Sequence, residues 1–125
     1  MLLSDFYETL DVVSNDDATI QFTIHINKDH KIFEGHFPNN PITPGVVLLQ
    51  VLKNCLEQYT NSKLRIQSTS NVKFLHPVNP EKHQQLVYSV QIQNEGGFLK
   101  VKNHTSFTDG TSVLKCNITF AKLPQ

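Results

Sequence analysis

The chain has 125 residues, of which 38% are apolar and 18% are charged, and its eleven basic residues balance its eleven acidic ones. This length suits one domain with a real hydrophobic core and is too short for two. The zero net charge argues against a nucleic-acid-binding surface, which needs an excess of basic residues. No apolar run approaches the length of a membrane span. We therefore expect residues 1–125 to form a single domain with no membrane span.

Charge and cysteine content narrow the class of protein further. Residues 1–62 are mainly acidic and residues 63–125 mainly basic. Either the two halves complement each other within the fold, or the second half presents a basic patch to an acidic partner. Cys55 and Cys116 stand in apolar contexts without motif spacing, which predicts two reduced, buried thiols in a cytoplasmic protein. The six histidines show no paired metal-ligand spacing, so we expect no metal and no cofactor.

The first elements are a short lead-in and a strand. Residues 4–13 fit either a short helix or an extended segment. Residues 19–26 alternate between apolar and polar side chains, which predicts a half-buried strand. The polar residues 28–35 then lead to a proline-rich loop.

The segment His36–Gln50, with the sequence HFPNNPITPGVVLLQ, joins this loop to an apolar helix. Its three prolines restrict the backbone strongly. Thr43 is the predicted N-cap, with Pro44 at the first helical position. The first half of the helix is apolar almost all round, so the helix must be enclosed. We expect it to end near Asn61.

Strands follow the helix to the end of the chain. The predicted strands are residues 64–69, 72–75, 86–93, 98–107 and 112–121. The turn at residues 94–97 and the Asp109-Gly110 pair predict two hairpins. One apolar helix followed by antiparallel hairpins predicts an α+β fold in which a sheet wraps around the helix. A sheet too small to cover the helix alone favours a dimer.

The loop and the helix start also hold candidate chemistry. The first amides of a helix lack partners within the helix. If the Thr43 hydroxyl accepts the Val46 amide, the Gly45 amide is left to bind an oxygen that gains negative charge. His36 is a candidate general base on the same loop. Proton abstraction next to a polarised carbonyl is one interpretation; the other is a structural His36 and a glycine that eases packing.

These residues resemble a known signature. Residues 35–38 (GHFP), Pro41 and residues 44–46 (PGV) are similar to the motif of the 3-hydroxyacyl-acyl-carrier-protein dehydratases of fatty-acid synthesis, which have the hotdog fold. The resemblance continues in residues 72–80 and 109–121, and so covers nearly the whole chain.

The resemblance implies a dimer with active sites built across the subunit interface. It implies that His36 is the base at the acyl α-carbon and that the Ile42 backbone carbonyl orients its imidazole. The Gly45 amide would bind the thioester oxygen, and Phe37 and Val46 would complete the substrate-binding residues.

The chain departs from the family at the catalytic acid, which stands fourteen residues after the histidine. Here that residue is Gln50. A glutamine can hold a water or a hydroxyl but has no carboxylic proton to donate. General acid catalysis contributes about 10²–10⁴-fold, so we expect a homodimer to be a weak dehydratase. Glu57 lies roughly 10 Å further along the helix and does not replace the acid.

Several functions therefore stay open. The chain is a dehydratase of 3-hydroxyacyl thioesters in fatty-acid or polyene-type lipid synthesis, either alone or as a half-site subunit beside a related hotdog chain. Alternatively, it is a thioesterase in which Gln50 positions water, or an acyl-thioester-binding protein without chemistry. The acyl group would be linked to a carrier protein or to coenzyme A. The assembly would be a homodimer, a heterodimer or a larger oligomer.

Overall fold

The computed structural model describes residues 5–16, 18–34 and 41–124. Its helical elements are the short 3-10 helix η1 (Lys31–Phe33) and the long helix α1 (Gly45–Thr60). Its strands are β1 (Tyr7–Ser14), β2 (Thr19–Ile26), β3 (Leu64–Phe74), β4 (Gln85–Glu95), β5 (Phe98–Phe107) and β6 (Ser112–Lys122).

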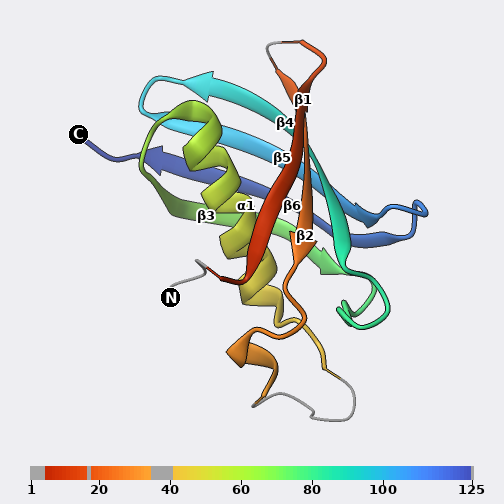
Figure 1. The fold of residues 1–125 in the computed structure, drawn as a ribbon. Coiled ribbons are helices and arrows are strands. Elements are labelled where there is room, and N and C mark those ends of the chain that lie inside the picture. Colours follow the sequence, from red (N-terminus) through yellow and green to blue (C-terminus); the bar gives the residue numbers. More distant parts are fainter. Residues whose placement is uncertain (1–4, 17, 35–40, 125) are drawn as a thin grey trace.

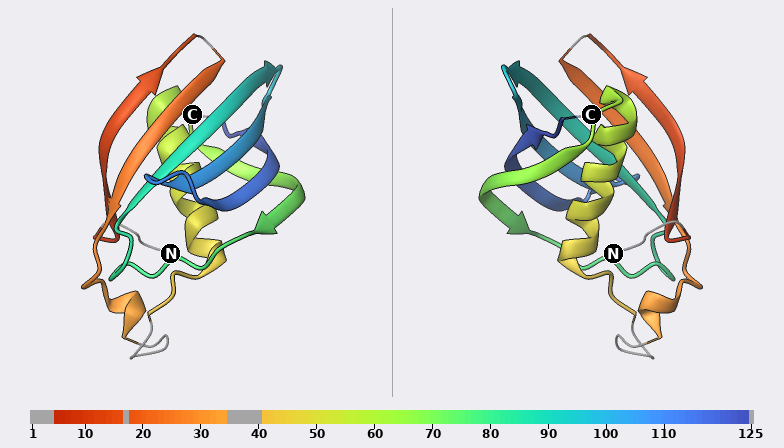
Figure 2. Two further views of the ribbon diagram at one scale, coloured as in Figure 1. Left: turned by 90° about the vertical axis from the view of Figure 1, so that its right-hand side faces the viewer. Right: turned by 90° about the vertical axis from the view of Figure 1, so that its left-hand side faces the viewer.

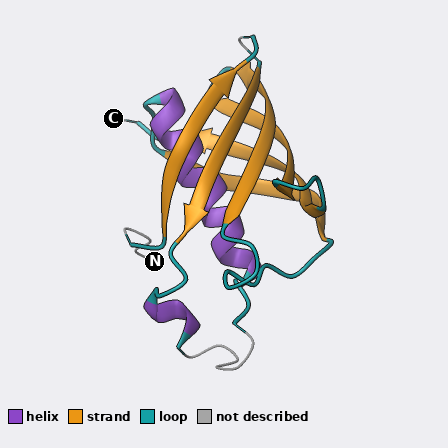
Figure 3. Cartoon of the chain, turned by 45° about the vertical axis from the view of Figure 1, so that its right-hand side comes forward, coloured by secondary structure: helices purple, strands orange, loops and turns teal. Residues whose placement is uncertain are grey.

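The strands form one antiparallel sheet in the order β1-β2-β4-β5-β6-β3. The sheet curves strongly, and α1 lies along its inner side (Figure 1). Views from both sides show the strands bending around the helix (Figure 2). Figure 3 shows the helix passing behind the strands of the curved sheet. The prediction of a sheet wrapped around one long helix is confirmed for the described residues.

The core forms between the buried face of α1 and the inner face of the sheet. The helix buries six side chains there: Val47, Leu48, Val51, Leu52, Cys55 and Leu56. Tyr88 on β4 is fully buried, and its hydroxyl donates a 2.9 Å hydrogen bond to the Leu48 carbonyl. Because an unpaired buried hydroxyl is costly, this bond favours one position of α1 along the sheet.

Two sequence predictions about strands need correction. Residues 7–14 form β1, paired with β2, so the helical alternative for residues 4–13 is wrong. The two short strands predicted at 64–69 and 72–75 are one strand, β3, with an irregular register between Ser70 and Lys73. Asn71 has a φ of 52° at this irregularity. A single left-handed residue lets the strand bulge and continue, which the alternation of side chains alone did not reveal.

The predicted capping of α1 is also wrong at the start. Pro44 is extended (φ −60°, ψ 142°) and is itself the N-cap, without a side-chain capping bond. The Thr43 amide donates a 2.9 Å hydrogen bond to the Val78 carbonyl, which ties Thr43 to the loop after β3. The Thr43 hydroxyl is buried and has no hydrogen-bond partner in the described structure. The predicted helix end is confirmed, since Asn61 is the C-cap in a left-handed conformation.

Candidate active site

At the start of α1, two backbone amides lack an acceptor in the described structure. The Pro44 carbonyl accepts hydrogen bonds from the amides of Val47 (3.0 Å) and Leu48 (3.3 Å). The amides of Gly45 and Val46 have no acceptor among the residues that the structure describes. The positive end of the helix dipole adds to their attraction for a negatively charged oxygen. The helix start can therefore bind an oxyanion through its backbone.

A cavity of about 410 Å³ opens at this helix start. The first segment lining it comes from the helix start and contributes Ile42, Thr43, Gly45 and Leu48. The other segment runs from the end of β3 into the following loop and contributes Phe74, Leu75, His76, Pro77 and Val78. Ile42 and Gly45, two of the predicted substrate-binding residues, thus share one largely apolar cavity.

The ring of Phe74 lies against Gly45. A Cβ atom added to Gly45 would lie only 2.6 Å from Phe74 Cζ and 2.8 Å from Cε1, closer than side chains pack. Phe74 itself is 52% exposed at the end of the edge strand. A side chain at position 45 would therefore have to displace this ring, and the ring covers the glycine from one side.

His76 belongs to a small cluster of rings beside the cavity. Its Nδ1 lies 2.6 Å from the Pro77 carbonyl oxygen, and its ring meets Phe107 edge-on at 5.2 Å. The ring of His83 stacks on the same Phe107 ring, with the two ring centroids 3.9 Å apart. These contacts hold the loop that forms one wall of the cavity.

Gln50 lies on a different face of α1. Five residues separate it from Gly45, which corresponds to about 140° around the helix and about 7.5 Å along it. Gln50 does not line the cavity, and its Nε2 donates a 3.0 Å hydrogen bond to Asn54 Oδ1. Val46, one turn before Gln50, is 62% exposed and also stands outside the cavity lining. Within one chain, the structure brings Ile42 and Gly45 together, but not with Gln50 or Val46.

His36 and Phe37 lie outside the described residues, so their assignments stay predictions. Sequence reasoning missed the contact of Phe74 with Gly45 and the partnership of Gln50 with Asn54. The second could have been found, because residues four apart on a helix are neighbours. The first depends on how β3 ends beside the helix, which no local pattern encodes.

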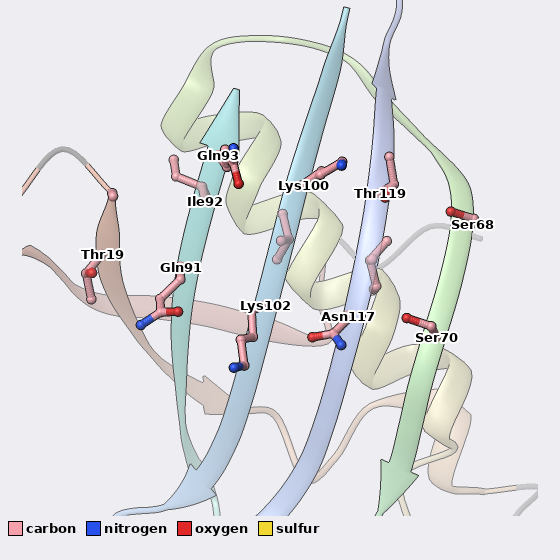
Figure 4. A pocket seen from close by; sticks show the side chains of 13 residues that line it. Thr19, Ser68, Ser70, Gln91, Ile92, Gln93, Lys100, Lys102, Asn117 and Thr119 are labelled. Atoms are coloured by element: carbon pink, nitrogen blue, oxygen red, sulfur yellow. The ribbon is translucent and has the colours of Figure 1, made fainter. Parts of the chain in front are cut away.

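A larger hollow, about 700 Å³, lies on the outer face of the sheet. Figure 4 shows polar side chains pointing away from α1, which lies behind the sheet. They include Gln91, Gln93, Lys100, Lys102, Asn117 and Thr119. The hollow contains none of the predicted site residues, and the sheet separates it from the helix start.

Comparison with known proteins identifies the family. The family model described as ApeI-like, ApeI dehydratase, matches residues 12–111. The chain belongs to the ApeI-like dehydratase family. Among curated relatives, a 3-hydroxyacyl-[acyl-carrier-protein] dehydratase FabZ of Fusobacterium nucleatum is 28% identical over 102 residues, covering 77% of this chain and 70% of that protein. A FabZ of Lactococcus lactis is 26% identical over 122 residues, covering 92% and 78%.

Solved structures share the fold of this ApeI-like chain. The dehydratase heterocomplex ApeI:P of Xenorhabdus doucetiae matches with a TM-score of 0.73 at 16% identity, covering 91% of this chain and 96% of that one. A hypothetical thioesterase with coenzyme A from Streptococcus pneumoniae matches with a TM-score of 0.68 at 12% identity, covering 99% and 92%. The predicted hotdog fold is confirmed. The function is that of a 3-hydroxyacyl-[acyl-carrier-protein] dehydratase-like protein, a hydro-lyase.

Two further features of this ApeI-like chain concern metals and membranes. Within the described ranges, no group of three or more His, Cys, Asp or Glu side chains is placed to hold a metal ion. No helix in the described part of the chain is long and apolar enough to cross a membrane.

Proposed function

We propose that this chain dehydrates 3-hydroxyacyl thioesters at the start of α1, with the Gly45 amide as the donor to the thioester carbonyl oxygen. The observation that carries the proposal is the Gly45 amide, which has no acceptor among the described residues and lies on an apolar cavity. A backbone amide at a helix start donates to an oxyanion without reorganising, and removing one such donor typically costs about 10²–10³-fold in rate.

In this proposal His36 removes a proton from the α-carbon of the acyl group. The electron pair moves toward the carbonyl oxygen, where the Gly45 amide stabilises the negative charge. The C–O bond to the 3-hydroxyl then breaks, a double bond forms between the α- and β-carbons, and the hydroxyl leaves as water after gaining a proton. The Ile42 carbonyl holds the His36 imidazole in one orientation, which is the role that the family resemblance implies for it. Phe37 and Val46 contact the acyl chain.

The departing hydroxyl needs a proton that Gln50 does not carry. We propose that a related hotdog chain supplies it with a carboxylate, so that His36 and Gly45 form half of a shared site. Two observations support this: Gln50 is not in the cavity with Gly45, and exposed apolar side chains adjoin that cavity. These are Val46 (62% exposed), Phe74 (52%) and Leu75 (48%). The solved ApeI:P structure, a dehydratase heterocomplex, is a precedent for such a pairing.

We further propose that the acyl group is delivered on a carrier protein, as the names of the curated relatives suggest. Coenzyme A thioesters are the alternative. Cys55 and Cys116 are both free and buried, which suits the reducing conditions of the cytoplasm.

The test measures enoyl-thioester formation from a 3-hydroxyacyl thioester by the full chain, alone and co-expressed with a candidate hotdog partner. We expect slow turnover alone and faster turnover with the partner. His36→Ala should abolish turnover in both cases, whereas the control His104→Ala, on the sheet's outer face, should not change it. Gln50→Glu should raise the rate of the chain alone.

Three outcomes would contradict the proposal. Turnover that survives His36→Ala would remove His36 as the base. Release of free thiol without enoyl product would identify a thioesterase. Thioester binding without any product, with or without the partner, would identify a binding protein.

A further inference from the structure

The outer face of the sheet carries one continuous polar hollow. The hollow of about 700 Å³ described above and a second one of about 490 Å³ share four lining residues: Thr19, Gln91, Lys102 and Asn117. Their linings come from five neighbouring strands, and Lys100 and Lys102 stand on β5 near the middle of this face (Figure 4). Among the described residues that line the two hollows there is no aspartate and no glutamate.

Basic side chains occupy adjacent register positions on this outer face. Lys73 on β3 lies directly opposite Lys115 on β6, and Lys115 lies opposite His104 on β5. Lys102 and Lys100 stand two and four residues before His104, which places them on the same side of β5. All four lysines are exposed. Like charges directly opposite each other destabilise a sheet, so this arrangement does not serve the stability of the free chain.

The acidic half of the sequence does not neutralise this face within the described ranges. One ion pair lies within α1, and the other joins Lys100 to Glu95 at 2.9 Å within the β4–β5 hairpin. Neither connects residues 1–62 with residues 63–125. Of the lysines in the hollow, only Lys100 has a carboxylate partner in the part of the chain that the structure describes. Of the two interpretations of the charge asymmetry, this favours a basic patch for an acidic partner.

The type and spacing of the cations indicate what kind of anion fits. Side chains on neighbouring strands stand about 4.8 Å apart, and alternate residues along one strand about 6.8 Å apart. Acidic side chains three or four residues apart on a helix are separated by about 5–6 Å, which matches this array. The linings contain no arginine, whose planar fork binds phosphate through two bonds, and no aromatic side chain on which a nucleic-acid base could stack.

We propose that the outer face of the sheet around Lys73, Lys102 and Lys115 docks an acidic helix of a partner protein. A second copy of this chain meeting it face to face would bring lysines against lysines. The sheet separates this face from the helix start, so a docked helix leaves the cavity beside Gly45 open. The inference depends on carboxylates and on no acyl thioester, and so it stands or falls apart from the proposed function.

A lysine-rich face can also serve only to keep the sheet in solution. The two roles differ in one measurable respect. A solvated face responds to the total charge of a ligand, whereas a docking face responds to how the carboxylates of the ligand are arranged.

The experiment measures binding of two labelled, alanine-based acidic peptides to the full chain by fluorescence anisotropy. Both have the same composition and about 20 residues, enough to stay helical. One carries its glutamates in a single stripe along the helix, and the other carries them all round. The chain should bind the striped peptide about fivefold more tightly, the scale of one well-placed ion pair. Single-stranded DNA of equal charge is the third ligand.

Variants of the face then identify the residues that bind. Lys102→Ala and Lys115→Ala should each weaken binding of the striped peptide about 2–5-fold, as expected for an exposed ion pair. Lys115→Glu should weaken it by more than about 10-fold, because it replaces an attraction with a repulsion. Lys28, an exposed lysine in the connector after β2, provides the matched controls. Lys28→Ala and Lys28→Glu change the net charge equally and should have little effect.

Four results would overturn the docking face. The first is no binding of the striped peptide at low ionic strength, where exposed charges are least screened. The second is equal binding of the striped and the all-round peptide. The third is an equal loss from Lys28→Glu and Lys115→Glu, which would show that only net charge matters. The fourth is equally tight binding of the single-stranded DNA, which would make the face a general polyanion surface.

Discussion

The two ends of α1 are built in opposite ways. At the C-terminal end, which we call the closed end, the carbonyls are occupied. The Thr60 hydroxyl donates to the Leu56 carbonyl (2.7 Å) and the Ser62 amide to the Glu57 carbonyl (3.2 Å). Asn61 completes this end in a left-handed conformation, with φ 53°. At the N-terminal end, which we call the open end, the N-cap is a proline and no acidic side chain stands in the first turn. The Gly45 amide there has no acceptor within the described part of the chain.

This difference shows which end of the helix keeps backbone groups available to bind a ligand. A capping side chain at the start would stabilise the helix but would also occupy the donors. Instead, the start is held by the fixed φ of Pro44 and by the backbone bond from Thr43 to Val78. The helix start is thus fixed in place by groups that leave its amides open to a ligand.

The largest expected effect follows from closing the open end with Gly45→Ala. The added methyl group would displace the Phe74 ring and obstruct the approach of a carbonyl oxygen to the amide. We expect kcat/KM to fall about 10²-fold, the scale of losing one oxyanion donor, with the free energy of unfolding changed by less than about 1 kcal/mol.

Gly97→Ala is the control, because a methyl group there meets no atom within 4 Å. Adding Phe74→Ala to Gly45→Ala separates the two causes of the loss. Recovery of activity in the double variant would identify displacement of the ring as the cause. An active Gly45→Ala single variant would remove the Gly45 amide from the mechanism.

The next largest effect is expected at the closed end, where Glu57 joins the helix to β3. Its Oε2 accepts the amide of buried Leu64 at 2.9 Å and lies 3.6 Å from Lys53 Nζ. Glu57→Ala leaves the Leu64 amide without its acceptor and should lower the free energy of unfolding by about 1–2 kcal/mol. Glu57→Gln keeps an acceptor and should cost about 0.5 kcal/mol, because partly exposed ion pairs contribute little. Denaturant unfolding measures both; equal losses would show that the charge, rather than the hydrogen bond, matters.

The contrast between the two ends was only partly predictable from sequence. The alternation of apolar and polar residues predicted β2, β4, β5 and β6. The turn at Asp109-Gly110 was predictable from the residue type, because Gly110 adopts a φ of 93°, which glycine favours. The helix end was also predicted, since asparagine tolerates the left-handed conformation. The extended Pro44 was not, because Thr43 is a good cap by type and its bond to Val78 joins segments far apart in sequence.

The candidate site was predictable to a similar degree. Motif resemblance selected Ile42 and Gly45, which the structure brings to one cavity. Motif resemblance could not show that Gln50 faces away from that cavity, because what a helical side chain faces depends on the elements packed around the helix. Asn54, which bonds to Gln50, was also missed, although it stands one helical turn further along α1.

A smaller effect is expected from Asn61, the left-handed residue at the closed end. Alanine tolerates this conformation less well than asparagine. Asn61→Ala should therefore lower the free energy of unfolding by about 1 kcal/mol, whereas Asn61→Gly should leave it equal or raise it slightly. Thermal unfolding measures both, and catalytic rates should not change. A loss of activity in Asn61→Ala without a loss of stability would show that the closed end also serves the site.

The smallest expected effect, and the one that tests the open end most directly, comes from Thr43→Val. If the Thr43 hydroxyl capped the helix, its removal would cost about 1 kcal/mol. In the structure this hydroxyl is buried, on a residue only 4% exposed, without a partner in the described residues. Replacing an unpaired buried hydroxyl with a methyl group of similar shape should be neutral or stabilising, by less than about 1 kcal/mol. Thr43→Ala, which also opens a void, should be less stable than Thr43→Val. A loss of about 1 kcal/mol in both variants would mean that Thr43 caps α1 after all and that this helix start is less open than its backbone indicates.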